Sequence, residues 1–502
     1  MPQALGSSPM QSSRLCILAA WFGALSHLLY YIKGYRDPQS PSIALVHSLL
    51  LPVIATAITT TQGLNVVSFL ASFQIWTSYH VGLFASIVLY RVYFHPLARV
   101  PGPFWAKVTK IPTIAIARHG KLHELHTEWA RKYGTIVRIA PNELLITSVS
   151  AIDTIHGLRS TATKRHTFYD YVQFHGALNL DSLYDRKEHR DRKRIWVFAM
   201  SNENMKTYEL NARDSTRPWL GRLSAASAAE TPLDVSLYMN LLTFDNMTRT
   251  GFSIDSGTVK LGVKNRTMQL MEANFARIAA SAHSIWPLRL LSRLGLLKGE
   301  DQVDIMRYFF DDFRSEKPRG FHDRRAIYAD AQAVMVGGTD TLSSLLTHCF
   351  YYLAKDSAMR KQLRQELAPA FGKSYPREFA YKDIDSLRLL DSVIIETLRM
   401  HSPTCNNGPR VTTEDTAIDG LLIPKDIVVY VGIHSTQRSS FVCVGTRLAL
   451  MVAKIVLSYT VFLYDFELSH DQAASDFLND SKNQLILKPG RLECVFTKLG
   501  SS

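Results

Sequence analysis

Apolar residues without charge dominate the first part of the chain. Residues 15–33 carry no charge before the final lysine, and no Asp, Glu, Lys or Arg occurs from Pro38 to Tyr90. A helix of about 20 apolar residues is long enough to cross a bilayer. The pattern therefore predicts three membrane spans, at about residues 15–33, 42–61 and 70–90.

Basic residues flank the predicted spans on one side of the membrane. Lys33 and Arg36 follow the first span, and Arg91 and Arg99 follow the third. Because cytoplasmic flanks collect Lys and Arg, the N-terminus is predicted to be lumenal and the chain after Arg91 cytosolic. Two alternatives stay open: the first span could be a signal peptide, or a single span at 70–90 could be the whole anchor.

A proline-rich, basic segment follows the predicted spans. It contains Pro96, Pro101 and Pro103. Proline fixes φ and prevents helix continuation, so this segment is either a plain linker or a stiff hinge. The chain thus divides into a membrane anchor at 1–95, a hinge at 96–110 and a further domain at 111–502.

Helical periodicity is the dominant pattern beyond the hinge. Residues 122–134 place apolar side chains at helical spacing and end on glycine, and 355–371 have the charged surface of a helix. Strand-like alternation occurs at 134–148, around a Pro-Asn turn, and at 416–432. The predicted fold class is mostly α with small β-sheets.

Composition narrows the function classes. The five cysteines form no CxxC pair, which argues against a disulfide framework and a structural zinc site. The net charge of +13 favours an anionic membrane, an acidic partner or nucleic acid. The dense basic run at 183–196 has no interleaved aromatic residues or nucleic-acid motif, so a solvated face or carboxylate or phosphate binding is preferred and no nucleic acid is expected.

The apolar helix predicted at 333–356 contains the small polar cluster GGTDT at 337–341. Two glycines inside a helix cost about 1 kcal/mol each relative to alanine. One interpretation is a kink or a tight helix crossing. The other is a helix that admits a small ligand and water beside the Asp340 carboxylate and the Thr341 hydroxyl.

Two further motifs lie closer to the C-terminus. Glu396 and Arg399 are three residues apart and share one helix face, either as a surface ion pair or as a partly buried structural pair. Cys443 directly precedes an apolar helix, and a helix N-terminus stabilises a thiolate. A single thiolate ligand suits haem iron.

The order of these features resembles the cytochrome P450 family: an anchor, a proline-rich hinge, GGTDT, ExxR, and CxG before a helix. The resemblance covers nearly all of residues 96–500, and the anchor is similar to that of fungal microsomal members. It implies a multi-pass protein of the endoplasmic reticulum membrane whose haem domain faces the cytosol. It also implies a monooxygenase that uses O2 and electrons from NADPH through cytochrome P450 reductase to oxidise an apolar small molecule, as in secondary metabolism.

The resemblance implies residue roles around haem. Cys443 corresponds to the axial thiolate ligand of the iron, and Gly445 to the residue that lets the backbone approach the haem. Arg410, and His189 with Lys193, correspond to propionate contacts. In the motif formed by His189 and Lys193, Lys193 stands where the family has Arg. Arg192 or Arg194 is expected to take over the role of that Arg.

The family pattern assigns roles to the remaining motif residues as well. Asp340 and Thr341 correspond to the catalytic pair that relays protons to bound oxygen, which argues against a haem-thiolate isomerase or dehydratase. Gly337 and Gly338 give room for oxygen. Glu396 and Arg399 correspond to the buried pair of the ExxR helix.

The chain departs from the family in front of Cys443. The family loop runs Phe-x-x-Gly-x-Arg-x-Cys-x-Gly, and here Thr436, Ser439 and Phe441 stand at the Phe, Gly and Arg positions. The preceding strand region runs almost directly into this loop, as though an internal block were missing. The alternative function is therefore a catalytically impaired P450-like membrane protein with a truncated haem loop.

Overall fold

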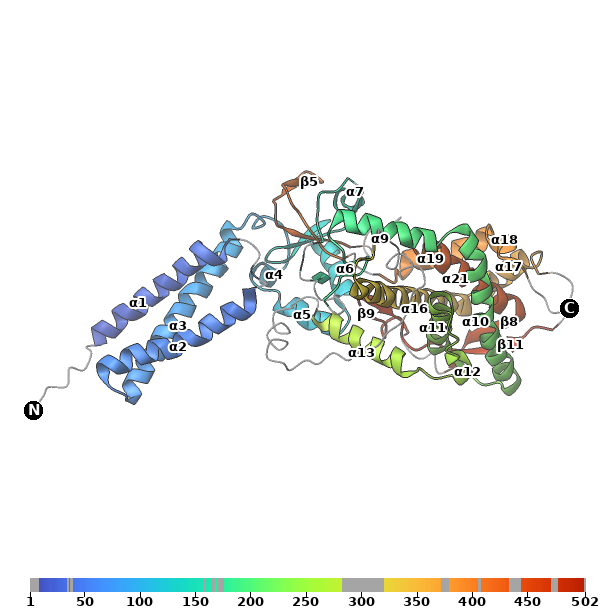
Figure 1. Cartoon of the computed structure of the whole chain (residues 1–502), viewed down its shortest axis with the longest axis horizontal. Coiled ribbons are helices and arrows are strands. Elements are labelled where there is room, and N and C mark those ends of the chain that lie inside the picture. Colours follow the sequence, from blue (N-terminus) through green and yellow to red (C-terminus); the bar gives the residue numbers. More distant parts are fainter. Residues whose placement is uncertain are drawn as a thin grey trace, which may run out of the picture.

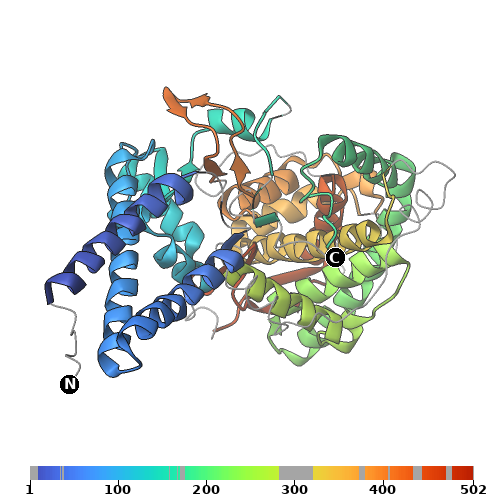
Figure 2. The same cartoon turned by 60° about the vertical axis from the view of Figure 1, so that its left-hand side comes forward.

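The computed structural model is mostly helical with small sheets, as the sequence predicts (Figure 1). It describes residues 9–33, 36, 39–157, 159–164, 166, 168–169, 176–281, 320–371, 379–404, 408–432, 444–470 and 477–500. A bundle of N-terminal helices lies beside a larger body, and the two views agree on this separation (Figure 2).

Long apolar helices form the N-terminal bundle. They are α1 (Pro9–Ser26) with its π-helical continuation η1 (His27–Tyr31), α2 (Ser40–Gln62), and α3 (Val66–Leu89) with η3 (Tyr90–Phe94). Ser13–Tyr31 and Ser40–Gln62 are long and apolar enough to cross a membrane, with 11% and 0% of their windows buried. The helix α21 (Thr446–Leu463) is equally apolar, but 67% of it is buried, which makes it a core helix rather than a span. The expected helix near 70–90 forms as α3 and carries no charge.

Small residues bring α1 and α3 into backbone contact. A Cβ added to Gly23 would lie 2.0 Å from the Tyr79 carbonyl oxygen, and one added to Gly82 would lie 2.0 Å from that of Ala20. In a bilayer such close packing, together with polar bonds, drives helix association. The hydroxyl of Tyr79 donates to Ser26 Oγ at 3.0 Å across the same contact.

A directed chain of hydrogen bonds attaches α2 to the other two helices. His80 Nδ1 lies 2.8 Å from the Trp76 carbonyl oxygen, which can only accept, so Nδ1 carries the proton and donates. His80 Nε2 is then the acceptor, and His47 Nδ1 donates to it at 2.9 Å. His47 Nε2 then accepts from the Tyr31 hydroxyl at 2.7 Å. The chain joins side chains from η1, α2 and α3 and fixes one tautomer for each histidine.

Arg138 attaches the proline-rich segment to the body. Its side chain lies on β1 (Ile136–Ala140) and is fully buried, and it donates to the carbonyls of Arg91 at 2.9 Å, Leu97 at 3.4 Å and Pro141 at 2.8 Å. Burial and the nearby charge of Arg91 lower the pKa of Arg138 to about 10. Its backbone N–H donates to Pro101 at 2.8 Å. The segment expected to be a hinge is therefore bound to β1 at several points.

Short strands form the β part of the body. The strands β1, β2 (Glu143–Ile146), β7 (Val428–Val431) and β4 (Arg410–Val411) form one sheet in that order, in which β2 and β7 are parallel. The remaining strands are β3 (Leu233–Asp234), β5 (Thr416–Ile418), β6 (Leu421–Ile423), β8 (Tyr464–Leu468), β9 (Lys482–Gln484), β10 (Ile486–Lys488) and β11 (Glu493–Lys498). The strands expected at 134–148 and 416–432 are thus confirmed.

Helices make up most of the body. They are α4 (Phe104–Val108), α5 (Ile111–Arg118), α6 (Leu122–Tyr133), α7 (Ser150–His156), α9 (Arg186–Ala199), α10 (Asn202–Ala229), α11 (Val235–Phe252), α12 (Thr258–Leu261), α13 (Arg266–Ser281), α16 (Arg324–Lys355), α17 (Ser357–Leu367), α18 (Tyr381–Ile384), α19 (Arg388–Met400) and α21. The helices α16 and α21 lie at the centre, because apolar residues cover most of their surfaces.

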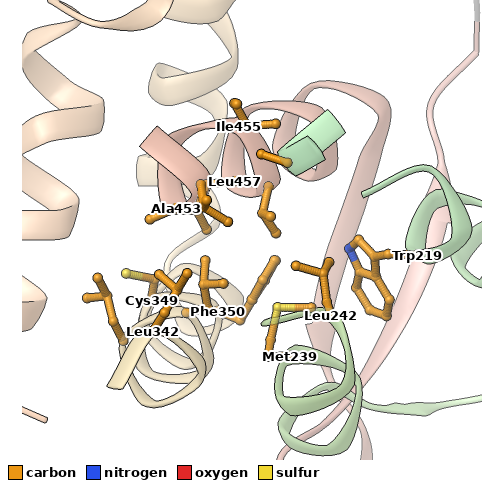
Figure 3. Close-up of a cluster of buried hydrophobic side chains, with 14 of the residues drawn as sticks. Trp219, Met239, Leu242, Leu342, Cys349, Phe350, Ala453, Ile455 and Leu457 are labelled. Carbon is orange, nitrogen blue, oxygen red and sulfur yellow. The ribbon is translucent and has the colours of Figure 1, made fainter. Parts of the chain in front are cut away.

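The main core lies between α10, α11, α16 and α21 (Figure 3). Trp219 of α10 is fully buried, and its indole N–H donates to Thr460 Oγ1 of α21 at 3.1 Å. Met239 and Leu242 of α11 lie opposite Phe350 of α16 in the same cluster (Figure 3). These contacts hold α16 in place along its C-terminal half.

We predict that Arg138→Met destabilises the protein by about 2–4 kcal/mol, because the carbonyls that Arg138 pairs would be left buried without donors. It should also expose the adjoining segment, so trypsin should cleave after Arg99 faster than in the parent protein. Both effects are measured in detergent, by thermal unfolding and by timed digestion. Arg118→Met, at an exposed position, is the matched control; equal cleavage rates in the two variants would contradict the attachment.

Candidate active site

The GGTDT segment does not interrupt the helix: α16 runs without a break from Arg324 to Lys355. Gly337 is exposed, and a Cβ added to it would meet no atom within 4 Å. Thr341 lies one turn further on the same face, and its hydroxyl donates to the Gly337 carbonyl. This face of α16 therefore borders open space, as a helix next to a bound ligand would.

The neighbouring residues of the segment face another helix. A Cβ added to Gly338 would lie 2.3 Å from Met247 Sδ of α11, so this glycine permits a tight helix crossing. Asp340 is buried, and one of its carboxylate oxygens accepts from Asn240 Nδ2 of α11 at 3.2 Å. Both interpretations of the segment thus hold for different residues: Gly337 leaves room, whereas Gly338 serves packing.

Charged groups surround Asp340. Burial raises the pKa of its carboxyl group, and Lys488 opposes that effect while Glu272 adds to it. Glu272 lies 2.6 Å from Lys264 Nζ and 3.5 Å from Lys488 Nζ, and these three side chains are partly exposed. Asp340 is therefore protonated more readily than an exposed carboxyl group is. It also lies near an ionic cluster that contacts water.

The expected propionate contacts lie together in a cluster of basic residues. Burial, and after it the charges of Lys164, Lys193 and Arg410, together lower the pKa of His189 to about 4. Burial also lowers the pKa of Lys164 to about 8, with Arg410 and Lys193 acting in the same direction. His156 joins them, its pKa lowered to about 3 by burial and by Arg410 and Lys164.

Backbone carbonyls and one phenol hold this cluster in place. Arg410 Nη1 donates to the Tyr169 hydroxyl and to the Gly408 carbonyl at 3.2 Å. Lys164 Nζ donates to the Asp181 carbonyl at 2.5 Å. The carboxylate of Asp181 raises the pKa values of Lys164 and His189 but does not offset the combined effect of burial and the neighbouring cations.

The sequence prediction missed Lys164 and His156. Both lie in or after α7, far in sequence from Arg410, and no motif marks them. The antiparallel bridge between Thr163 and Val411 brings the two segments together. Tertiary pairing of that kind gives no local signal in one sequence.

The expected arginine substitutes do not join the cluster. Arg192 is buried and lies 2.5 Å from Glu188 and 3.7 Å from Asp330 of α16, and Arg194 is exposed. The expectation that Arg192 or Arg194 replaces Lys193 is therefore wrong. On the helix α9, Arg192 points inward toward α16, so Lys193 is the residue that faces His189 and Lys164.

The basic cluster fits haem, whose two propionates are carboxylates. Charge-assisted bonds from Arg and Lys are strong contacts for such groups. Cys443, the expected iron ligand, lies outside the described residues. Gly445 lies at the N-terminal cap of α21 with φ −82°, a conformation that any residue can adopt. Its expected role, to let the backbone approach the haem, would therefore depend on its lack of a side chain and not on backbone freedom.

The ExxR pair forms, but it is not buried. Arg399 Nε donates to Glu396 Oε2 at 2.7 Å, yet the two side chains are 39% and 56% exposed. Ile395 and Met400, on the same side of α19, are also exposed. The expectation of a buried pair is wrong, because both side chains lie on the exposed face of α19.

Comparisons with known proteins indicate a family. The family model for Cytochrome P450 matches residues 295–442. The chain is 27% identical to cytochrome P450 monooxygenase FCK2 of Fusarium pseudograminearum over 95% of this chain and 96% of that protein. It is 29% identical to tryprostatin B 6-hydroxylase of Aspergillus fumigatus over 72% of this chain and 67% of that protein. The chain is therefore similar to cytochrome P450 monooxygenases, a class of oxidoreductases.

Some positions of the same alignments are not filled by a residue of this chain. The alignment with the Fusarium protein has 543 positions, but 95% of 502 residues fills only about 477 of them, which leaves about 66 without a residue from this chain. For lcsK of Purpureocillium lilacinum, 553 positions and 96% coverage leave about 71. The family match ends at residue 442, directly before Cys443.

Asp330 connects α16 to α9 behind the basic cluster. Its fully buried carboxylate accepts from the Leu180 N–H at 2.6 Å and from Trp196 Nε1 at 3.0 Å, and Arg192 lies 3.7 Å away. Burial outweighs these contacts and raises the pKa of Asp330 to about 6. The folded state therefore holds the proton more tightly than the unfolded chain does.

We predict a pH-dependent difference in stability between the parent protein and Asp330→Asn. A raised pKa favours folding below pH 4, and this contribution, on the order of 3 kcal/mol, is lost as the pH rises through 6. The parent should thus lose stability relative to the variant between pH 4 and 6, with a constant difference above pH 7. Urea unfolding at a series of pH values measures this. Asp153→Asn, at an exposed position, should show no such slope, and a pH-independent difference for Asp330→Asn would contradict the burial argument.

We predict that Lys193→Gln has opposite effects on the empty and the haem-loaded protein. Removing one of several neighbouring cations should raise the unfolding temperature of haem-free protein, because repulsion falls. It should weaken haem binding about tenfold, because one contact to an anionic group is lost. Thermal unfolding and haem titration by absorbance measure the two effects. Arg194→Gln is the control on the exposed side of α9, and the interpretation fails if both variants behave alike.

Proposed function

We propose that the chain is a membrane-bound haem-thiolate monooxygenase that oxidises an apolar small molecule in fungal secondary metabolism. The observation that carries the proposal is the cluster of basic residues that Arg410 of β4, His189 and Lys193 of α9, and Lys164 form. Arg410, His189 and Lys193, together with Lys164 and His156, would hold the propionates, and Cys443 would hold the iron. When bound, the haem supplies activation of O2 and transfer of one oxygen atom to the substrate.

The residues of α16 would manage protons and space. Gly337 has no side chain and so leaves space beside the helix. The neighbouring Thr341 hydroxyl donates its proton to the Gly337 carbonyl, so its lone pairs can accept a hydrogen bond. Asp340 would store a proton, since burial raises its pKa. The partly exposed cluster of Lys264, Glu272 and Lys488 supports proton exchange between Asp340 and water.

The exposed face of α9 supports docking of an electron donor. Arg190 and Arg194 have highly exposed side chains, and Val197 and Phe198 add exposed apolar surface at the end of the same helix. Basic residues around an apolar centre complement an acidic protein surface. The partner would be NADPH–cytochrome P450 reductase, which supplies the electrons.

The N-terminal bundle would anchor the protein in the endoplasmic reticulum membrane. The exposed apolar faces of α1, α2 and α3 support insertion, and Lys33 and Arg36 support a cytosolic flank. Multi-pass insertion leaves the body in the cytosol, on the same side as the reductase. Apolar substrates dissolved in the bilayer would then be close to the enzyme.

A second candidate function is favoured by the shortened alignments and the exposed ExxR pair. About 66 alignment positions are not filled by this chain, and Glu396 and Arg399 contact water; both observations would fit a loss of material on the thiolate side of the haem. It would then be a catalytically impaired P450-like membrane protein. This candidate keeps the anchor and the fold but not the oxidation.

We predict that reduced full-length protein, purified in detergent and exposed to carbon monoxide, gives the red-shifted absorption band of thiolate-ligated haem. Cys443→Ala should abolish the band, and Cys349→Ala, at a buried core position, should retain it if the protein folds. Near-ultraviolet circular dichroism checks folding independently. A folded protein with no band would refute the monooxygenase proposal and support the impaired form.

A further inference from the structure

A second feature of the body has no part in the proposed oxidation. It is a hollow of about 660 Å³ between α10, α11 and α12. In Figure 1 these helices lie at the end of the body away from the N-terminal bundle. We call it the α10–α12 hollow; its lining comprises Asp214, Arg217, Pro218, Gly221, Arg222, Ala225, Arg249, Asp255 and Lys260.

Small residues form the floor of the hollow. Pro218, Gly221 and Ala225 follow one another at helical spacing on α10, so they share a face. A Cβ added to Gly221 would meet no atom within 4 Å. Glycine inside a helix lowers stability by about 1 kcal/mol relative to alanine. Among the described residues, no packing contact requires glycine at position 221. A ligand that lies directly above this position would require it.

Basic residues form the walls. Arg217 Nη1 lies 2.7 Å from Asp214, and Arg249 Nη2 lies 2.9 Å from Asp255. Lys260 Nζ is 3.8 Å from Asp255 as well. Arg217, Arg249 and Lys260 thus share two carboxylates, and the excess charge is positive among the lining residues that the structure describes.

Arg222 adds a fourth cation and fixes the position of Lys260. Its guanidinium donates to the carbonyls of Val259 at 3.3 Å and Lys260, so α12 is bound to α10. The Arg249 side chain is 22% exposed, and its buried Nε has no hydrogen-bond partner among the described residues. Arg222 and Arg249 thus place guanidinium groups of α10 and α11 beside the same hollow.

We propose that the α10–α12 hollow binds a small soluble anion that carries two or more phosphate groups. The volume is typical of small-molecule sites, and guanidinium groups match phosphate oxygens in geometry and charge. Exposed ion pairs contribute little to stability by themselves, so the lining can exchange partners with a ligand at low cost. The position away from the anchor favours a soluble phosphate over a lipid headgroup. The site is independent of haem and of the proposed oxidation.

The probe for the proposal is inorganic pyrophosphate, titrated calorimetrically into full-length protein in detergent at constant ionic strength. We expect saturable binding that Gly221→Leu abolishes, because leucine fills the floor without changing the charge and has better helix propensity than glycine. Arg249→Gln should weaken binding at least about tenfold. Lys425→Gln removes an exposed cation on another part of the surface and should leave affinity unchanged.

Three results would overturn the proposal. Equal affinity in the parent protein and Gly221→Leu would mean that pyrophosphate binds elsewhere. A non-saturable response that sodium chloride reproduces would mean that the lining is only a network of ion pairs. Sedimentation with vesicles containing phosphatidic acid that depends on Arg249, without pyrophosphate binding, would assign the hollow to a lipid headgroup. The carbon monoxide spectrum does not bear on any of these results.

Discussion

Repulsion among neighbouring basic groups is the constraint on which the site depends. Arg410 enters the cluster from β4, His189 and Lys193 from α9, and Lys164 from the segment after α7. Among them, Arg410, Lys164 and Lys193 carry positive charge into partly buried surroundings, where Arg410 and Lys193 disfavour the charged form of Lys164. Such an arrangement lowers the stability of the empty protein and becomes favourable when a dianionic group lies among them. Folding and cofactor binding are therefore coupled through charge.

The helix α16 shows how one element serves several contacts. Asp330 faces α9, Gly338 and Asp340 face α11, and Gly337 with Thr341 faces open space. Phe350, further along, lies in the apolar core (Figure 3). Because packing fixes the C-terminal half, the polar segment is held at a defined rotation. The Asp340 carboxylate is turned toward Asn240 of α11, whereas Gly337 and Thr341 border the open space.

Local signals in the sequence were enough to predict most of the helices and strands and some of the site residues. The uncharged stretches correspond to α1, α2 and α3, and the alternating segments near residues 140 and 420 correspond to strands. The motifs identified Arg410 and His189, which the structure brings together. Lys164 was missed because a β-bridge, not a sequence neighbour, places it there. The burial of Glu396 was overestimated because exposure depends on which segment covers α19, and spacing within one helix carries no information about that.

The core and the cofactor site make different demands on the chain. The helix α21 follows Cys443, yet its buried face packs against α10 and α16, and Trp219 donates to Thr460 without involving the cysteine. The main core is therefore independent of the segment before Cys443, while Glu396 and Arg399 on α19 stay exposed. A protein of this kind can keep the P450 fold and its basic cluster whether or not the thiolate reaches the iron. Fold stability and haem ligation are separable properties here, and evidence for one is not evidence for the other.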